Sequence, residues 1–455
     1  MTALHQSYGG RPASNADAGS REDVLRARDR RTIARVRAAE RPLWLLLLLA
    51  GPGILVMLGE NDGPSMLSYA TTGALYGVGF FVPFILLTFA MAFVVQEMTV
   101  RLGLATHRGH AELIFERFGA FWGYFAMGDL VVGNVLTLVT EFIAISAGSL
   151  YFGVPGPLSV ALAVALVAAG LMTRRYVTWE RLLLALTIGN LFFIPAALYA
   201  HPSGAALAHA LTHWGPLPGG LRTSFLTLVL ANIGATITPW MIFFQQSAVV
   251  DKGLTKADLA QGRLDTALGA ALAAVVAIAT VVAAAPLFTA HVNVAHFASG
   301  ADFASALRPY LGNTGATLFA LGMIEAGAVA AMTISASSAY AVCETVRSQH
   351  SLNLNFSEGR LFYGIALISV LVSAGIVLIP HAPLLAITLS VNIIATLLMA
   401  PALLFVLMLV NDREIMGDLA NGTRANVAGT TIVVGIALLG AVYGVLAVFP
   451  NVLGR

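Results

Sequence analysis

The apolar positions of this chain gather into long runs that are separated by short polar segments. A helix needs about 20 apolar residues to cross the hydrocarbon core of a bilayer. Runs of spanning length predict eleven membrane helices, at residues 43–76, 78–99, 120–151, 157–172, 180–200, 223–247, 264–290, 313–344, 359–379, 383–410 and 426–449. This pattern is typical of an all-α membrane protein.

The first run carries charged residues at its centre. The segment GENDGP places Glu60, Asn61 and Asp62 directly before Gly63 and Pro64. An ionised carboxylate at bilayer depth costs about 2.5–3.5 kcal/mol, and proline disfavours helical backbone at the residue before it. We therefore expect the helix to break here, and the freed carbonyls beside the carboxylates to form a cation site.

A second interruption lies in the sixth run, where GATITPWM occupies residues 234–241. Interrupted helices at matching places in two halves of a chain indicate the binding site of a transporter. Each proline alone would also fit a structural kink, but the charges beside Pro64 favour the functional interpretation.

Composition excludes most other classes of protein. The chain is 58% apolar and 11% charged, against about 25% charged residues in an ordinary soluble domain. The single cysteine, Cys343, excludes an intramolecular disulfide and a cysteine-based zinc site. No nucleotide-binding loop, nucleophile elbow or metalloprotease motif is present, so we expect no enzyme activity, no cofactor and no nucleic-acid partner. The oligomeric state stays open.

Positive charge is distributed unevenly along the chain. The chain has 25 lysines and arginines, and 22 of them lie in the N-terminal tail, in every second loop or at the span ends next to those loops. The exceptions are Arg222, Arg308 and Arg455. Because cytoplasmic segments are enriched in these residues, we predict a plasma (inner) membrane protein with its N-terminus in the cytoplasm and its C-terminus outside. The predicted cytoplasmic loops are residues 101–118, 173–180, 248–263, 345–358 and 411–425.

Ten of the helices divide into two halves of five. An odd number per half inverts the second half, and the two breaks then fall in the first helix of each half, as in a LeuT-type inverted repeat. The predicted parts are an Arg-rich cytoplasmic tail at 1–41, a first repeat at 42–200, an extracellular loop at 201–222, a second repeat at 223–410, and a loop with the eleventh helix at 411–455.

Several segments resemble the natural resistance-associated macrophage protein (NRAMP) family of divalent-metal transporters. They are GPGILV, the broken acidic motif, GALYG and RLGLATHRGHAEL. The resemblance implies a LeuT-type fold with a metal site between broken helices 1 and 6. The family's helix-1 motif, Asp-Pro-Gly-Asn, is matched by Asp62, by Gly63 and Pro64 in inverted order, and by Ser65.

The helix-6 motif of the family, Ala-Thr-Val-Met-Pro-His, corresponds to residues 235–240. The resemblance implies that the Ala235 carbonyl binds metal, whereas Thr238 replaces the methionine sulfur ligand. Oxygen donors suit Mg²⁺ and Mn²⁺, while a thioether favours softer ions. With Glu60 and Asn61 as additional oxygen donors, the sequence resembles the NRAMP-related magnesium transporter branch.

The residues that couple transport to protons in the family are mostly absent. Trp240 and either Gln245 or Gln246 stand where its helix-6 histidines would be, and histidine titrates near neutral pH. We therefore expect alternating-access transport of Mg²⁺ and Mn²⁺ without obligatory proton coupling. Candidates for the ion path are polar residues within the spans, namely Asn134, Glu141, Gln245, Gln246 and Glu325.

Two alternatives remain. A proton-coupled Mn²⁺/Fe²⁺ symporter fits the wider family, because Glu141 or Glu325 could carry a proton. A metal-sensing receptor without transport is the alternative from a different class. The partners expected in every case are a divalent metal ion and the lipid bilayer.

Overall fold

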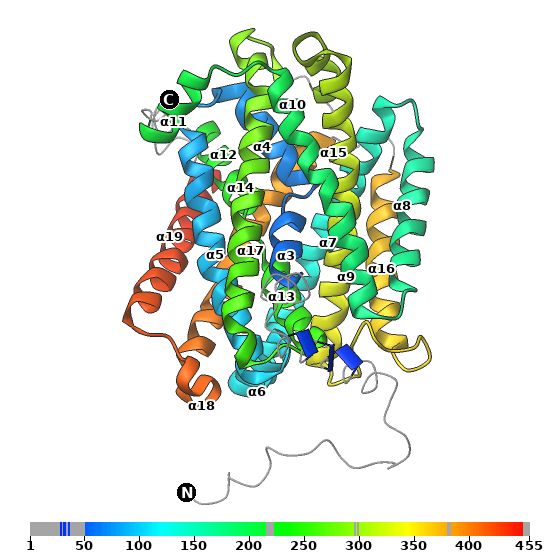
Figure 1. Cartoon of the computed structure of the whole chain (residues 1–455), viewed down its shortest axis with the longest axis vertical. Coiled ribbons are helices and arrows are strands. Elements are labelled where there is room, and N and C mark those ends of the chain that lie inside the picture. The colour runs from blue at the N-terminus through cyan, green and yellow to red at the C-terminus, as the bar shows by residue number, and fades with distance from the viewer. Residues whose placement is uncertain are drawn as a thin grey trace, which may run out of the picture.

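The protein is an all-helical bundle in which some helices are interrupted (Figure 1). The structure, a computed structural model, describes residues 28–29, 31–32, 35–36, 51–214, 223–294, 297, 300–379 and 384–448. Most of the predicted tail, the start of the first predicted span and part of the predicted loop at 201–222 lie outside these residues.

The first half of the described chain contains the first interrupted helix and the helices that surround it. Its elements are α3 (Pro52–Gly59), α4 (Gly63–Tyr76), α5 (Phe81–Thr106), α6 (His110–Phe118), α7 (Ala120–Tyr151), α8 (Gly156–Leu171), α9 (Tyr176–Leu186), the 3₁₀ helix η1 (Thr187–Phe192), α10 (Phe193–Tyr199) and α11 (Gly204–Thr212).

The second half begins with the other interrupted helix. Its elements are α12 (Thr223–Gly234), α13 (Pro239–Lys252), η2 (Lys256–Asp258), α14 (Leu259–Thr289), α15 (Gly300–Thr345), α16 (Arg360–Val377), α17 (Leu384–Asn411), α18 (Arg413–Met416), η4 (Gly417–Leu419) and α19 (Thr423–Val448).

Within the part of the chain that the structure describes, nine helices are long and apolar enough to cross a membrane. One of the nine joins α12 and α13 across their break, another joins α9, η1 and α10, and α8 is a shorter apolar helix. The pair α3 and α4 adds the interrupted helix that the sequence predicts. The protein is therefore a multi-pass membrane protein.

Both predicted breaks are present in the structure. Helix α3 ends at Gly59, and α4 begins at Gly63 with Pro64 in its first turn. Helix α13 begins at Pro239, after Thr238 in an extended conformation (φ −123°, ψ 156°). Proline is favoured in the first turn because its missing N–H needs no partner there. The same residue that stops one helix therefore starts the next.

Several of the predicted loops contain helical residues. Helix α6 occupies the second half of the predicted loop 101–118, because the apolar residues Ala111, Leu113 and Ile114 are buried against the bundle. Helices α13 and α14 extend into the predicted loop 248–263, and helix α11 lies within the predicted loop 201–222.

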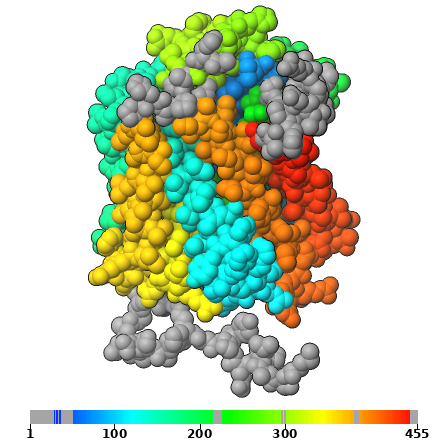
Figure 2. Space-filling view, turned by 180° about the vertical axis from the view of Figure 1, so that it is seen from behind, coloured from blue at the N-terminus to red at the C-terminus, as the bar shows by residue number. Residues whose placement is uncertain are grey.

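Helices α7 and α15 form a central packed pair, against which α16 and α17 also lie. Figure 2 shows this side of the molecule, with the α6–α7 segment in cyan between α16 and α17. In Figure 1, α3 and α13 lie in the lower half of the bundle, and α4 and α12 lie in the upper half. Both breaks therefore occur near the middle of the bundle.

Close packing of α4 on α14 depends on Gly73. A Cβ atom added there would lie 2.2 Å from the carbonyl oxygen of Val281. Moving the backbone of α14 away would disrupt its packing, so we expect Gly73→Ala to lower the free energy of unfolding by about 1–3 kcal/mol. Thermal unfolding of the purified protein measures this effect. Gly128→Ala, on α7 with open space around it, is the matched control, and equal melting temperatures for the two variants would contradict the packing.

Candidate functional site

The first break presents the carboxylate of Asp62 at the start of α4. The Asp62 backbone is extended (φ −78°, ψ 177°), and its side chain accepts a hydrogen bond of 2.9 Å from the N–H of Ser65. Asp62 is therefore the N-cap of α4, where unpaired N–H groups and the helix dipole favour negative charge. Glu60, Asn61 and Asp62 are at most 1% exposed, so the break is closed to solvent.

The second break lies beside the first and is bonded to it. The Thr238 hydroxyl donates a hydrogen bond of 2.7 Å to Oε2 of Glu60. The Tyr69 hydroxyl, on α4, donates a hydrogen bond of 2.8 Å to the carbonyl of Ala235. Two segments that are about 180 residues apart in the chain thus lie in contact. They contain the predicted site residues Glu60, Ala235 and Thr238.

Helix α7 adds a third carboxylate to the breaks. Oε2 of Glu141 accepts a hydrogen bond of 3.0 Å from the N–H of Gly63, and the side chains of Glu141 and Asp62 are close enough to interact. A Cβ atom added to Gly63 would lie 2.1 Å from Cβ of Ala144. Only glycine at position 63 lets α7 approach closely enough for this contact.

Several buried oxygen atoms around the breaks have no hydrogen-bond partner. They are Glu60 Oε1, Asn61 Oδ1, Ser65 Oγ and Glu141 Oε1. In the part of the chain that the structure describes, no lysine, arginine or histidine forms an ion pair with the three carboxylates. An unsatisfied buried acceptor costs about 1–3 kcal/mol, and more when it is charged. A bound cation would satisfy these oxygens.

The arrangement limits which metal sites are possible. Among the described residues, no three His, Cys, Asp or Glu side chains lie together as a ready metal site. A metal ion at the breaks would therefore need further ligands from amide, hydroxyl and carbonyl oxygens or from water. Mg²⁺ is commonly held in this way, by one or two carboxylates and retained water.

Two of the predicted ion-path residues make structural contacts elsewhere. The Asn134 amide donates to the Ser338 hydroxyl at 2.9 Å, which ties α7 to α15. The Glu325 carboxylate, on α15, accepts hydrogen bonds from the Asn190 amide at 2.9 and 3.2 Å. Neither contact reaches the breaks, so a role of Asn134 or Glu325 in the ion path stays a prediction.

The two glutamines of α13 also bond to neighbouring elements. The Gln245 amide donates to the Thr266 hydroxyl at 3.1 Å, and the Gln246 amide donates to the backbone carbonyl of Arg108 at 2.8 Å. Gln246 also bonds to His110 at 3.0 Å, and burial lowers the pKa of that imidazole to about 4. His110 is therefore neutral at physiological pH.

The structure adds residues that the sequence reasoning did not assign to the site. Tyr69 lies two helical turns after Asp62, and this i, i+7 spacing could have placed it on the same face. The Asn392 amide, on α17, donates to the Pro64 carbonyl at 3.1 Å and to the Ser68 hydroxyl at 2.8 Å. It fixes the first turn of α4, which carries Asp62.

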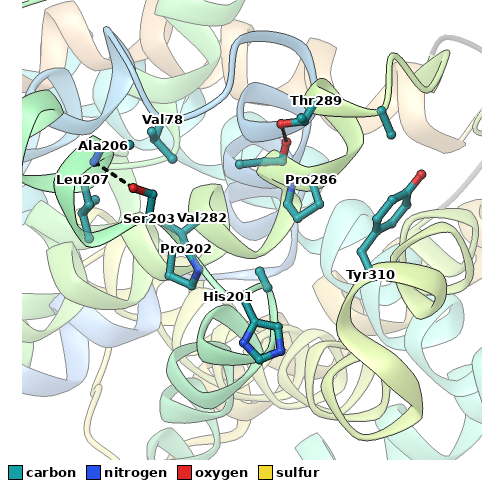
Figure 3. A pocket seen from close by; sticks show the side chains of 13 residues that line it. Val78, His201, Pro202, Ser203, Ala206, Leu207, Val282, Pro286, Thr289 and Tyr310 are labelled. Carbon is teal, nitrogen blue, oxygen red and sulfur yellow. Dashed lines mark hydrogen bonds between the residues drawn. The ribbon is translucent and has the colours of Figure 1, made fainter.

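A cavity near one end of the bundle lies away from the breaks. Its volume is 460 Å³, and it is lined by the segment 200–203, by α11, by the end of α14 and by Tyr310 of α15 (Figure 3). His201, Pro202, Pro286 and Tyr310 line it, and no residue of either break does. The carboxylate site is thus enclosed by protein, separate from this cavity.

The family follows from a comparison with known proteins. The model of the family described as "Natural resistance-associated macrophage protein-like" matches residues 53–446. The chain belongs to this family. The match includes both breaks and the helices that surround them.

Curated relatives and solved structures agree with this assignment. The divalent metal cation transporter MntH of Pectobacterium carotovorum is 27% identical over 409 residues, which are 85% of this chain and 92% of the relative. The MntH of Yersinia enterocolitica is 29% identical over 297 residues, 62% of this chain and 69% of the relative.

Among solved structures, the Eremococcus coleocola manganese transporter has a TM-score of 0.71 at 21% identity, covering 88% of this chain and 87% of that one. MhsT in complex with L-phenylalanine has a TM-score of 0.59 at 12% identity, covering 87% of this chain and 97% of that one. At these identities, the similarity shows the fold alone.

Proposed function

We propose that this NRAMP-family protein transports divalent metal ions, Mg²⁺ and Mn²⁺, across the membrane by alternating access. The observation that carries the proposal is the group of buried carboxylates at the two breaks, Glu60, Asp62 and Glu141, with no basic partner among the described residues. Carboxylates within a membrane mark ion pathways, because they are too costly to keep without a partner. The MntH relatives are named as divalent metal cation transporters.

The proposed ligands are Asp62 as the principal one, with Ser65, the Ala235 carbonyl, Thr238, Glu60 and Asn61 around it. The unpartnered oxygens of Glu60, Asn61 and Ser65 support this set. All of these donors are oxygen atoms, and such sites suit Mg²⁺ and Mn²⁺ rather than softer metals. This chemistry supports the magnesium-transporting branch of the family.

The proposed architecture is eleven spans with a five-plus-five inverted repeat of the LeuT type. It is supported by the nine long apolar helices, by α8 and by the interrupted pair α3–α4. The placement of lysine and arginine supports a cytoplasmic N-terminus and an external C-terminus. In such folds, substrates bind at the broken helices, between the two repeats.

We expect transport without obligatory proton cotransport. Trp240 occupies the position of a family histidine and is buried against Gly59, beside the first break. The membrane potential drives a divalent cation inward by about 4.6 kcal/mol per 100 mV, since each charge contributes about 2.3 kcal/mol. The second candidate, a proton-coupled Mn²⁺/Fe²⁺ symporter, is favoured by the carboxyl pair of Asp62 and Glu141.

Asp62→Asn is predicted to abolish Mg²⁺ and Mn²⁺ uptake into proteoliposomes. Asparagine is as good an N-cap as aspartate, so α4 keeps its start while the site loses its principal charge. Thermal unfolding is expected to stay close to that of the wild type. Asp129→Asn, which removes another carboxylate of α7, is the control and should transport normally. Uptake at the wild-type rate by a well-folded Asp62→Asn protein would contradict the assignment of Asp62 as a metal ligand.

Thr238→Met is predicted to shift selectivity toward softer ions, because it introduces a thioether next to Glu60. Competition of Cd²⁺ against Mn²⁺ uptake is the readout, and we expect Cd²⁺ to compete about tenfold better. Thr238→Val removes the hydroxyl without adding sulfur and is the matched control. If both variants respond alike to Cd²⁺, the side chain at position 238 does not face the ion.

Proton coupling is tested by the internal pH of proteoliposomes during metal uptake under an imposed potential. We expect the internal pH to stay constant as Mg²⁺ or Mn²⁺ enters. Acidification that scales with metal entry and disappears in Glu141→Gln would move this protein to the proton-coupled class.

A further inference from the structure

Three charged side chains surround the end of α3 that lies away from the break. The carboxylate of Asp265, on α14, accepts hydrogen bonds from the backbone N–H groups of Gly51, Gly53 and Ile54 at 3.1, 2.7 and 3.4 Å. These groups open α3 and have no partner within the helix. Asp265 therefore holds the first turn of α3 against α14.

A buried ion pair lies on the same turn. Nζ of Lys252, at the end of α13, is 2.8 Å from Oε2 of Glu180 on α9, and the two side chains are 4% and 2% exposed. A Cβ atom added at Gly51 would lie 2.3 Å from Oε1 of Glu180 and 2.8 Å from Nζ of Lys252. Gly51, the residue before α3, thus lies directly against the ion pair.

These three residues, here named the inner clamp, join both interrupted helices to the surrounding bundle. Lys252 and Asp265 also interact electrostatically with each other. Helix α3 leads to the first break and α13 leads away from the second, so the inner clamp lies at the far end of both. Because α3 and α13 belong to the lower half of Figure 1, the inner clamp lies toward that end of the bundle.

We propose that the inner clamp of Glu180, Lys252 and Asp265 is the gate that keeps the ion site closed toward the cytoplasm. This inference rests on the proposed transport function. When α3 moves away from α9 and α14, water replaces the lost partners of all three side chains. Glu180 and Asp265 then face the opened path as hydrated carboxylates, which attract a departing divalent cation.

The inner clamp makes the closed state sensitive to the loss of one partner. Among the described residues, Lys252 is the basic partner of Glu180, and removing it leaves the buried carboxylate with only the hydrogen bond of 3.0 Å from the Tyr176 hydroxyl. In the open state, water solvates that carboxylate. Breaking one partner of a buried pair is strongly destabilising for this reason. Lys252→Met is therefore expected to favour the open state.

The accessibility of a single cysteine tests the gate. Met57 is fully buried on α3, next to Gly269 of α14, and becomes exposed only when these helices separate. The full-length chain carries Met57→Cys with its native cysteine removed (Cys343→Ala). A membrane-impermeant maleimide is added to inside-out or right-side-out vesicles. We expect Lys252→Met to accelerate labelling at least about tenfold, from the cytoplasmic side only.

Two further variants separate gating from misfolding. Lys252→Arg keeps the positive charge between Glu180 and Asp265 and should keep the slow rate of labelling. Lys256→Gln, a change at an exposed side chain of η2, should leave the rate unchanged. Unchanged labelling in Lys252→Met, equal labelling from both sides, or equally fast labelling in Lys252→Arg and Lys252→Met would overturn the gate. If labelling behaves as expected but no metal is transported, the proposed function fails and the gate stands.

Discussion

The structure depends on the cost of placing three carboxylates in a dry interior. Glu60, Asp62 and Glu141 are each about 0–1% exposed, and each receives a hydrogen bond from a donor beside the breaks. The interrupted helices place these donors: Thr238 lies in the extended segment before α13, and the N–H groups of Gly63 and Ser65 lie in the first turn of α4. The buried carboxylates thus depend on the helix breaks for their hydrogen-bond donors.

The hydrogen bonds leave the carboxylates only partly satisfied. One oxygen of Glu60 and one of Glu141 have no donor, and the Asn61 and Ser65 oxygens nearby are also unpartnered. An ordinary structural site would fill these positions with N–H groups or a basic residue. In a transporter, these oxygens must stay without a protein partner, because the transported cation binds to them and then leaves.

The sequence predicts the breaks well because their causes are local. Pro64 and Pro239 stop helices through their own backbone geometry, and the charges at residues 60–62 stand out in an apolar run. Contacts between segments that are far apart in the sequence are harder to predict from the sequence. Nothing local indicates that Thr238 bonds to Glu60, or that Lys252, at the end of an apolar run, is buried against Glu180.

The family resemblance supplied part of this missing information for the site. It joined residues 62–65 to residues 235–238, which periodicity alone could not do. It gave no indication of Asp265, because that residue acts through the N–H groups of α3 rather than through a motif. Side chains that bond to backbone depend on where a helix ends, and the sequence leaves helix ends uncertain by one or two residues.

The central claim is that a divalent cation binds between the two interrupted helices. Crystals grown with Mn²⁺ and measured at an X-ray energy where manganese scatters anomalously test it directly. The account predicts an anomalous peak within bonding distance of an Asp62 carboxylate oxygen, at about 2.0–2.3 Å, which disappears in Asp62→Asn crystals. A well-occupied peak at another place in the bundle, with none between α4 and α13, would contradict it.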